Sequence, residues 1–340
     1  MIYFLFHHDR WDDQYLIKEL GEENVRCIYS HDYQQWYMRH WRHFGGSLKA
    51  VRASKKGDTI VAWHYLQAVL AWWICKLTFR KRQFVSLNIL LKKDKTLKNK
   101  LHRYLCKKAF QAKNFRATVT SVPYGKWLNK QLGIDVEYPL LHDVYHDYYC
   151  TPQYSEGKNK DIVFCGGASG RDWELMLDII RITPELKFYM VMPKHIFRPF
   201  MKKHGDDLPQ NVKIGCNMPY KEFMFRLCQS TLVVLPLSIN APAGLTVMYQ
   251  AAANRRMVLT SDTEAMKEYF MPYQLCGKDP EQWRDKIRYY LQHEDERKAE
   301  ADRFHDFITT QCTETDYARI VAQVCKELTP DKSSSSLSIH

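Results

Sequence analysis

The ten cysteines of this sequence lack the spacing of a metal-binding or redox pair. Neighbouring cysteines are never closer than 12 residues apart, so no C-x-x-C pattern and no zinc-type Cys/His spacing occur. Scattered thiols of this kind are typical of proteins that fold in a reducing compartment. The sequence therefore predicts free core cysteines, no bound metal ion and a cytoplasmic location.

A secretion signal and a membrane-spanning run are missing as well. Residues 1–6 form an apolar run that is too short for a signal peptide and has no basic leader. The only long apolar stretch, 61–79, contains His64, Gln67 and Lys76, whose burial in hydrocarbon is costly. We therefore expect no transmembrane helix, and we expect residues 2–6 to form a buried strand.

Internal repeats of solenoid length are also absent. A chain of 340 residues with 45% hydrophobic content is too long for one compact core, so two domains are expected. Short apolar runs alternate with segments of helical periodicity, which is the pattern of parallel sheets covered by helices. We predict an α/β protein with two Rossmann-like, doubly wound domains. Their ranges are 1–150 for the N-terminal domain, 151–160 for a linker, 161–310 for the C-terminal domain, 311–330 for a last helix and 331–340 for a disordered tail.

The alternation also gives the expected elements. Apolar runs bounded by turn residues predict strands, and apolar residues at helical spacing predict helices. The predicted strands are 2–6, 25–29, 59–63, 84–88, 117–121, 161–165, 187–192, 212–214, 231–235 and 257–260. The predicted helices are 12–20, 65–77, 97–112, 123–132, 171–182, 220–228, 246–253, 263–269, 281–307 and 315–328.

Acidic residues are scarce in the first half of the chain. Residues 1–150 hold 25 Lys and Arg against 13 Asp and Glu, whereas 151–340 hold 25 of each, so the net charge of +12 belongs to the first half. Within it, residues 76–130 carry 16 basic side chains and a single acid, Asp94. Such a field attracts anions, which include nucleic acid, anionic lipid and phosphorylated substrates.

Two tryptophans stand beside this basic tract. Interfacial tryptophan and clustered Lys and Arg are the features of proteins that dock on anionic lipid, where each basic residue contributes roughly 1 kcal/mol. A packed core surrounded by solvated lysines explains the same pattern equally well. The residues of this candidate membrane or acceptor-side surface are Trp72, Trp73, Lys76, Arg80, Lys81 and Arg82.

Glycines follow the first predicted strand of the second domain. Gly166 and Gly167 end the run that begins at Val163, and Arg171 stands at the start of the next predicted helix. Glycine lets the backbone approach a ligand closely, and the N–H groups at a helix start favour an anion. Arg171 adds a forked, charged donor that suits a diphosphate. A surface turn without a ligand remains the alternative.

A second loop of small residues follows the strand at 231–235. It contains Ala243 and Gly244 and opens a helix whose first turn includes Leu245 and Thr246. Gln250 stands one turn further, where a polar side chain reaches sugar hydroxyls. Two helix starts adapted to anions in one sheet are a stronger indication than either alone.

Short motifs follow one another in a distinctive order over residues 161–270. They are Gly166-Gly167, Arg171-Asp172-Trp173, Asn211-Val212, Pro219-Tyr220, Ser230, Pro236-Leu237, Ala243-Gly244-Leu245-Thr246 and Glu268-Tyr269. This order resembles the donor-binding domain of GT-B glycosyltransferases of the family 4-like, or group 1, kind. The resemblance implies two Rossmann-like domains facing each other across a cleft, with C-terminal helices packing across and a nucleotide-diphosphate sugar bound by the second domain.

The resemblance also implies roles for individual residues. Gly166, Gly167 and Arg171 would face the donor diphosphate, and Ala243 to Thr246 would meet its phosphates at the helix start. Gln250 would contact the ribose, and Met218 would lie beside the base. One departure concerns charge, because retaining members often carry two glutamates where this chain has the small residues 241–243 and the neutral Gln250.

The catalytic group is expected in the N-terminal domain. The groups that follow its predicted strands are His7, His8, Asp9, His64 and Asn88, and His64 is our candidate for a general base. A retaining enzyme could use the leaving phosphate as base and need His64 only for positioning. The resemblance implies that no metal ion is required and that there is no cofactor apart from the nucleotide sugar, which is a substrate.

The sequence thus predicts a cytoplasmic hexosyltransferase of undecided stereochemistry, with a lean towards retention. Its acceptor would be a glycan or a lipid-linked glycan in bacterial surface polysaccharide synthesis, on the inner face of the membrane. Two alternatives remain open: a nucleic-acid-binding protein that uses the basic half, and a sugar-nucleotide epimerase of the same fold. Nucleic acid is not the expected partner, because it leaves the pattern at 161–270 without a role.

Overall fold

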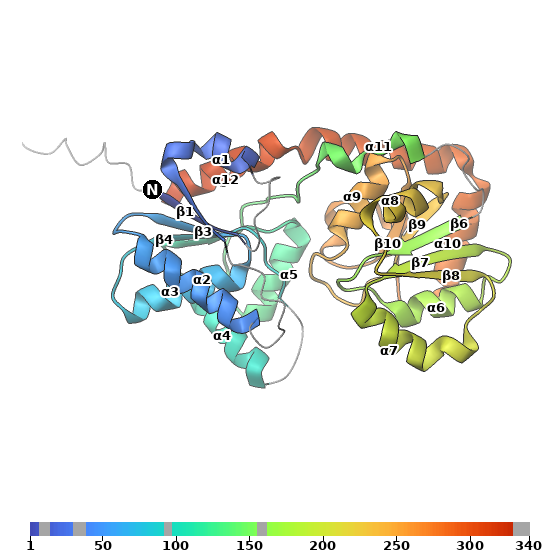
Figure 1. Cartoon of the computed structure of the whole chain (residues 1–340), viewed down its shortest axis with the longest axis horizontal. Helices are drawn as coiled ribbons and strands as arrows, with labels where there is room; N and C mark the ends of the chain where they lie inside the picture. The colour runs from blue at the N-terminus through green and yellow to red at the C-terminus, as the bar shows by residue number, and fades with distance from the viewer. Residues whose placement is uncertain (7–13, 30–38, 92–96, 155–161, 329–340) are drawn as a thin grey trace, which may run out of the picture. The chain divides into compact units, whose positions relative to one another are not determined.

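The computed structural model describes residues 1–6, 14–29, 39–91, 97–154 and 162–328 (Figure 1). The chain divides into two compact units, the first made of residues 1–142 and 314–340 and the second of residues 143–313. The division lies eight residues before the boundary predicted from the sequence. The helix at 314–328, predicted as a separate element, belongs to the first unit.

The first unit is a parallel sheet of five strands covered on both faces. The strand order is β2-β1-β3-β4-β5. Helices α2, α3 and α4 cover one face, and α1 and α12 lie together on the other (Figure 1). The strands are β1 Ile2–Phe6, β2 Val25–Tyr29, β3 Thr59–Ala62, β4 Gln83–Ser86 and β5 Phe115–Ala117, and the helices are α1 Gln14–Leu20, α2 Arg39–Ala53, α3 Tyr65–Leu77, α4 Leu97–Phe110, α5 Val122–Leu132 and α12 Glu314–Leu328.

The second unit is a parallel sheet of six strands in the order β11-β10-β9-β6-β7-β8. The strands are β6 Ile162–Gly166, β7 Lys187–Met192, β8 Val212–Cys216, β9 Leu232–Leu235, β10 Met257–Ser261 and β11 Leu275–Cys276. The helices are α6 Trp173–Arg181, α7 Lys194–His204, α8 Tyr220–Gln229, α9 Leu245–Ala253, α10 Pro280–Gln292 and α11 Glu294–Gln311. Short 3-10 turns at 22–24, 147–149, 152–154, 205–207, 266–268 and 272–274 complete the described elements.

Local sequence accounts for the helix ends. Helix α5 begins after Ser121, whose hydroxyl accepts the N–H of Tyr124 at 3.3 Å, and Pro123 fits its first turn. It ends at Gly133, which adopts the left-handed conformation with φ 60°. Residues of these types are typical of helix starts and ends, and the helix differs from the predicted one by a single residue at its start.

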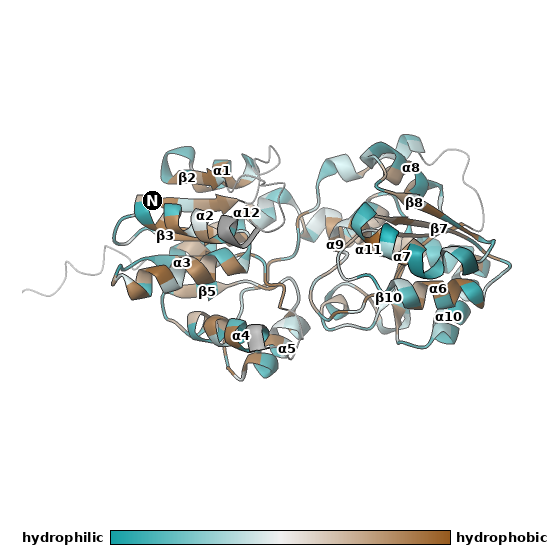
Figure 2. Ribbon diagram, turned by 60° about the horizontal axis from the view of Figure 1, so that its bottom comes forward, coloured by the Kyte–Doolittle hydropathy of each residue, from teal (hydrophilic) through white to brown (hydrophobic). Residues whose placement is uncertain are grey.

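The cores lie between the sheets and their helices. Figure 2 shows hydrophobic residues along the strands, with hydrophilic residues on the outer sides of the helices. In the first unit α12 packs against α1, and the Tyr317 ring lies 6.1 Å from that of Tyr15 and 6.0 Å from that of Trp63. The last helix of the second half of the sequence therefore completes the first hydrophobic core.

Several elements differ from the sequence prediction. Helices α2 and α7 have no predicted counterpart, because α2 contains Gly45-Gly46 and α7 contains Pro199, residues that weaken a helical pattern. The predicted helix 263–269 is only a 3-10 turn at 266–268. The predicted helix 281–307 is two helices that meet at His293.

Some sequence predictions fall outside the described residues. These are His7, His8 and Asp9, part of the predicted linker, and the tail at 331–340. Among the helices that are described, none combines the length and the apolar content needed to cross a membrane. The apolar stretch at 61–79 contains α3, which has only 13 residues.

Candidate functional site

Strands β6 and β9 are neighbours at the point where the second sheet reverses its order. From β6 the chain continues to β7 and β8 on one side, and from β9 to β10 and β11 on the other. The carboxyl ends of two strands at such a switch point form the crevice in which open α/β sheets bind ligands. Both glycine-containing turns predicted from the sequence follow these two strands.

Backbone hydrogen bonds join the two turns. The N–H of Asp172 donates to the carbonyl of Pro236 at 2.9 Å, and the N–H of Ser238 donates to the carbonyl of Gly170 at 2.9 Å. Between them, Arg171 and Leu237 form an antiparallel bridge. The turns after β6 and β9 are therefore one structure.

The side chain of Arg171 lies inside this structure. It is only 7% exposed, and its Nε donates to the carbonyl of Gly166 at 2.8 Å while Nη1 donates to the carbonyl of Ser169 at 3.2 Å. Burial lowers the pKa of the guanidinium, whereas the thiol of Cys165 acts in the opposite direction. Arg171 thus has a structural role in addition to the one predicted, because it holds the first turn through two carbonyls.

Two glycines border the guanidinium. Gly167 has φ 114° and Gly244 has φ 85°, both in the region that favours glycine. A Cβ atom at Gly167 would lie 2.7 Å from Nη2 of Arg171, and one at Gly244 would lie 2.7 Å from Nη1. The guanidinium therefore lies between the two turns, and a residue larger than glycine at position 167 or 244 would collide with it.

The two helix starts are not equivalent. Helix α6 has its own acidic cap, because Asp172 Oδ1 accepts the N–H of Leu175 at 3.2 Å and Oδ2 pairs with Lys278 at 2.8 Å. Helix α9 begins at Gly244 without a side-chain cap, and Thr246 in its first turn is exposed. Of the two helix starts, α9 has backbone donors that no capping side chain occupies, and anion binding at either start stays a prediction.

Two further predicted donor residues are Gln250, in α9, and Met218, which follows β8. Gln250, in α9, is 5% exposed, and its side chain hydrogen-bonds to the hydroxyl of Tyr220. Burial and the neighbouring Tyr148 raise the pKa of Tyr220 to about 12, so the hydroxyl keeps its proton. Met218, before α8, is half-buried, and the adjacent Asn217 adopts φ 50°.

The structure thus brings Gly166, Gly167, Arg171, Ala243 and Gly244 together at one switch point. Leu245 is buried at the start of α9. Lys278 and Tyr220 were not identified as site residues from the sequence. Lys278 reaches Asp172 across 106 residues of sequence, and no spacing rule indicates such a contact.

His64 lies at the switch point of the first sheet, directly after β3. Its Nδ1 accepts the N–H of Leu66 at 3.2 Å, which makes it the N-cap of α3. While Nδ1 accepts this bond, the proton of a neutral ring sits on Nε2, which then donates and does not accept. A role as general base would require this cap to break, so that role stays a prediction.

The tryptophans of the predicted membrane surface are buried or half-buried. Trp72 is 7% exposed and its Nε1 donates to Asn114 Oδ1 at 3.2 Å, while Trp73 is half-buried and donates to the carbonyl of Leu105. Arg82 is 8% exposed and donates to the carbonyl of Ser54 at 2.6 Å. This corrects the prediction for these three residues, because α4 and the loop before β3 cover them.

The other three residues of that set are exposed. Lys76 lies over the rings of Trp72 and Trp73, at 4.8 and 5.1 Å from their centroids. Arg80 donates to the carbonyl of Val51 at 3.0 Å, and Lys81 is exposed. The basic character of this region is therefore retained at the surface, without its tryptophans.

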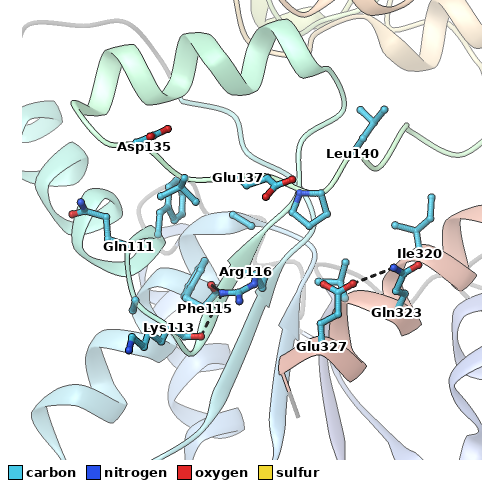
Figure 3. Close-up of a pocket in the computed structure, with 16 residues that line it drawn as sticks. Gln111, Lys113, Phe115, Arg116, Asp135, Glu137, Leu140, Ile320, Gln323 and Glu327 are labelled. Carbon is cyan, nitrogen blue, oxygen red and sulfur yellow. Dashed lines mark hydrogen bonds between the residues drawn. The ribbon is translucent and has the colours of Figure 1, made fainter. Parts of the chain in front are cut away.

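A groove of about 980 Å³ lies in the first unit, beside the edge strand β5 (Figure 3). Figure 3 shows Arg116, Glu137 and Glu327 around it, on β5, on the segment after α5 and on α12. Its lining contains the acids Asp135, Glu137 and Glu327 against two basic residues, Lys113 and Arg116. This excess of carboxylates disfavours a diphosphate, so the groove is not a candidate for the predicted donor site.

Within the described ranges, no three His, Cys, Asp or Glu side chains gather into a group that could hold a metal ion. All ten cysteines are free thiols, and seven of them are buried as the sequence predicts, whereas Cys27 is half-buried and Cys150 and Cys216 are exposed. Burial raises the pKa of the Cys165 thiol, next to Arg171, to about 12, which makes it a structural thiol.

Comparisons with known proteins bear on the fold and on the family that the second half of the chain resembles. Residues 171–326 match the model of a family described as glycosyl transferase-like. Anabaena HepE in complex with UDP-glucose has a similar structure, with a TM-score of 0.72 and 12% identity over 96% of this chain and 99% of that one. The catalytic domain of starch synthase IV from Arabidopsis thaliana is also similar, with a TM-score of 0.63 and 10% identity. A UDP-forming α,α-trehalose-phosphate synthase from Burkholderia vietnamiensis has a TM-score of 0.63 and 11% identity. Both alignments cover 96% of this chain and 99% of the other chain.

A search of curated proteins finds no match. The structural neighbours confirm the predicted fold, two Rossmann-like units of the GT-B type. The chain therefore has the GT-B fold, and its residues 171–326 are similar to the glycosyl transferase-like family.

Proposed function

We propose that the protein transfers a sugar from a nucleotide-diphosphate sugar, bound by the second unit, to a glycan or lipid-linked acceptor in bacterial surface polysaccharide synthesis. The observation that carries the proposal is the uncapped start of α9 at Gly244, next to the guanidinium of Arg171. Backbone N–H groups at a helix start and an arginine are the donors that a diphosphate requires. HepE, which has the same fold, was solved with UDP-glucose.

The reaction breaks the bond between the anomeric carbon and the donor phosphate oxygen. A new bond forms between that carbon and an acceptor hydroxyl oxygen, and the hydroxyl proton and a nucleoside diphosphate are released. The charge that develops on the leaving diphosphate would be met by Arg171 and the α9 amides, without a metal ion. Preorganised donors of this kind stabilise the leaving group most when its charge is greatest.

We propose a retaining hexosyl transfer. On this route the leaving phosphate accepts the proton, and His64 positions the start of α3 through its Nδ1 contact with Leu66. The neutral Gln250 replaces the charged ribose partner found in retaining relatives, and Met218 lies beside the base. We place the reaction in the cytoplasm, at the inner face of the cell membrane.

A charge placed in the first turn of α9 tests the donor site. Thr246 is exposed, so Thr246→Asp leaves the packing intact, and an acid at this position stabilises the helix by about 0.3–1 kcal/mol. The same charge repels a diphosphate, and we expect donor affinity to fall on the order of tenfold or more. Titration calorimetry with UDP-, GDP- and other nucleotide sugars measures both the donor preference and the loss.

Thr315→Asp is the matched control. Thr315 is likewise an exposed threonine in the first turn of a helix, α12, but belongs to the first unit. We expect this variant to bind the donor as the wild type does. Equal donor affinity of Thr246→Asp and wild type would contradict the site. Release of nucleoside diphosphate only when an acceptor is present would separate transfer from epimerisation.

A further inference from the structure

The turn between α3 and β4, residues 76–82, carries the two most exposed large hydrophobic side chains of the described residues. Leu77 is 72% exposed and Phe79 is 94% exposed. A single exposed hydrophobic residue needs no explanation, but two in one short turn form an apolar tip. We call residues 76–82 the α3–β4 turn.

The turn is held in place by its own backbone. The N–H of Thr78 donates to the carbonyl of Ile74 at 3.0 Å, its hydroxyl donates to the same carbonyl at 2.7 Å, and the N–H of Arg80 donates to the carbonyl of Cys75 at 2.8 Å. These bonds close the end of α3. The exposure of Leu77 and Phe79 is therefore a property of a fixed turn.

The conformation of Phe79 is unfavourable for a phenylalanine. Its φ is 55°, in the left-handed region where glycine is preferred and a bulky residue costs on the order of 1 kcal/mol. A side chain that is 94% exposed gains almost no packing to offset this strain. Fold stability thus gives no reason for a phenylalanine at this position, and a contact with something outside the chain does.

Cations surround the apolar tip. Lys76 and Lys81 are exposed in the turn itself, and Lys55 and Lys56 are exposed in the loop before β3. The two loops touch, because the N–H of Gly57 donates to the carbonyl of Lys81 at 3.4 Å.

Acids lie elsewhere along this edge of the sheet or are already engaged. Asp58 Oδ2 accepts the N–H of Lys55 at 2.6 Å, and Oδ1 lies 3.5 Å from the N-terminal amine. Glu22 and Glu23 precede β2, which is three strands away from β4. The positive charge at the tip is therefore not neutralised by these carboxylates.

We propose that the α3–β4 turn docks the first unit on an anionic lipid bilayer. Leu77 and Phe79 enter the boundary between headgroups and acyl chains, and Lys55, Lys56, Lys76 and Lys81 contact the headgroup phosphates. Nucleic acid would also attract the lysines and could stack on Phe79, but it gives no reason for the exposed aliphatic Leu77, which a bilayer accommodates. This docking surface rests on the membrane association in the proposed function and names the residues that would make it. Binding to the bilayer through this surface does not require the donor site.

Vesicle sedimentation tests the surface. We expect the wild type to sediment with phosphatidylglycerol vesicles and not with phosphatidylcholine vesicles. For the double variant Leu77→Gln/Phe79→Gln, the partition coefficient between buffer and vesicles should fall by about tenfold or more. The reason is that two apolar side chains no longer enter the bilayer. The control Leu101→Gln/Tyr104→Gln changes two side chains on α4 that are 60% and 52% exposed, and should bind as the wild type does.

Phe79→Gly separates docking from folding. Glycine relieves the strain at φ 55°, so the melting temperature should stay the same or rise while vesicle binding falls. Equal vesicle binding by wild type and both Phe79 variants would overturn the proposal. So would loss of binding in the α4 control alone, or binding to single-stranded RNA without binding to vesicles. Donor titration of the double variant should be unchanged, so a failed vesicle test leaves the donor site standing.

Discussion

The two sheets of this protein end differently at their switch points. In the first, β3 leads to His64, whose imidazole occupies the start of α3. In the second, β6 and β9 lead to glycines with positive φ, and α9 begins without a side-chain cap. One sheet uses its own side chain to satisfy the helix start, and the other leaves backbone donors beside an arginine. The comparison distinguishes a helix start that the chain caps itself from one whose backbone donors stay available to an anion.

Among the variants that test this difference, the one that removes Arg171 should have the largest effect on the free energy of unfolding. Arg171→Ala leaves the carbonyls of Gly166 and Ser169 without their donor in a buried site, which costs about 2–5 kcal/mol of folding free energy. Hydrogen exchange of the β6 and β9 amides measures the loss, and the β1 and β3 amides of the first unit serve as the reference. Unchanged protection in β6 would show that Arg171 serves only a ligand.

Two glycines with similar backbone conformation separate strain from contact. Gly57 in the first unit has φ 88°, and a Cβ atom added there would have nothing within 4 Å, whereas at Gly244, φ 85°, that atom would meet Arg171. We expect Gly57→Ala to cost about 1 kcal/mol and Gly244→Ala to cost about 2 kcal/mol or more. Only Gly244→Ala should also weaken donor binding. Equal melting temperatures for the two variants would argue against the close approach of the guanidinium.

The cap of α3 can be tested by substitution of its side chain. His64→Ala removes the acceptor for the N–H of Leu66 and should cost about 1 kcal/mol, while His64→Asn restores an acceptor and should recover most of it. On the retaining route, sugar transfer by His64→Asn stays near the wild-type rate. A turnover number that falls to the same low level in both folded variants would instead establish His64 as the base.

The smallest effect on vesicle binding is expected at Trp72. Trp72→Phe removes the Nε1 bond to Asn114 and puts a smaller ring in the buried space of the indole, which should cost about 1–3 kcal/mol of stability. Vesicle sedimentation of this variant should equal that of the wild type, since Trp72 is in the core. If sedimentation with vesicles falls while the melting temperature is unchanged, Trp72 does contribute to membrane binding.

The backbone features of both units could be predicted well from the sequence. Glycines after apolar strands indicate turns with special φ, and this property is local to the chain. The strands at 2–6, 25–29 and 187–192 and the helix at 65–77 have the predicted bounds. The close approach of Gly167 and Gly244 to one guanidinium could not be predicted from the sequence, because it depends on which strands are neighbours in the sheet.

Exposure of side chains was predicted less well. Trp72 and Phe79 lie seven residues apart in an apolar, basic stretch, and composition does not distinguish them. Trp72 is buried and bonded to Asn114 before β5, whereas Phe79 lies beyond the end of α3, where no described element covers it. The pairing of Asp172 with Lys278 had no local signal either, since it joins residues that only the fold brings together.

The return of the chain to the first unit has a consequence for the order of folding. Residues 143–313 are continuous, so a ribosome finishes the second unit before it makes α12. Until residues 314–328 emerge, the face of the first sheet that carries α1 lacks its partner helix and leaves Tyr15 and Trp63 without the ring of Tyr317. We expect nascent chains arrested before residue 314 to have a protease-resistant second half and a protease-sensitive first half, so that the half translated first is the half completed last.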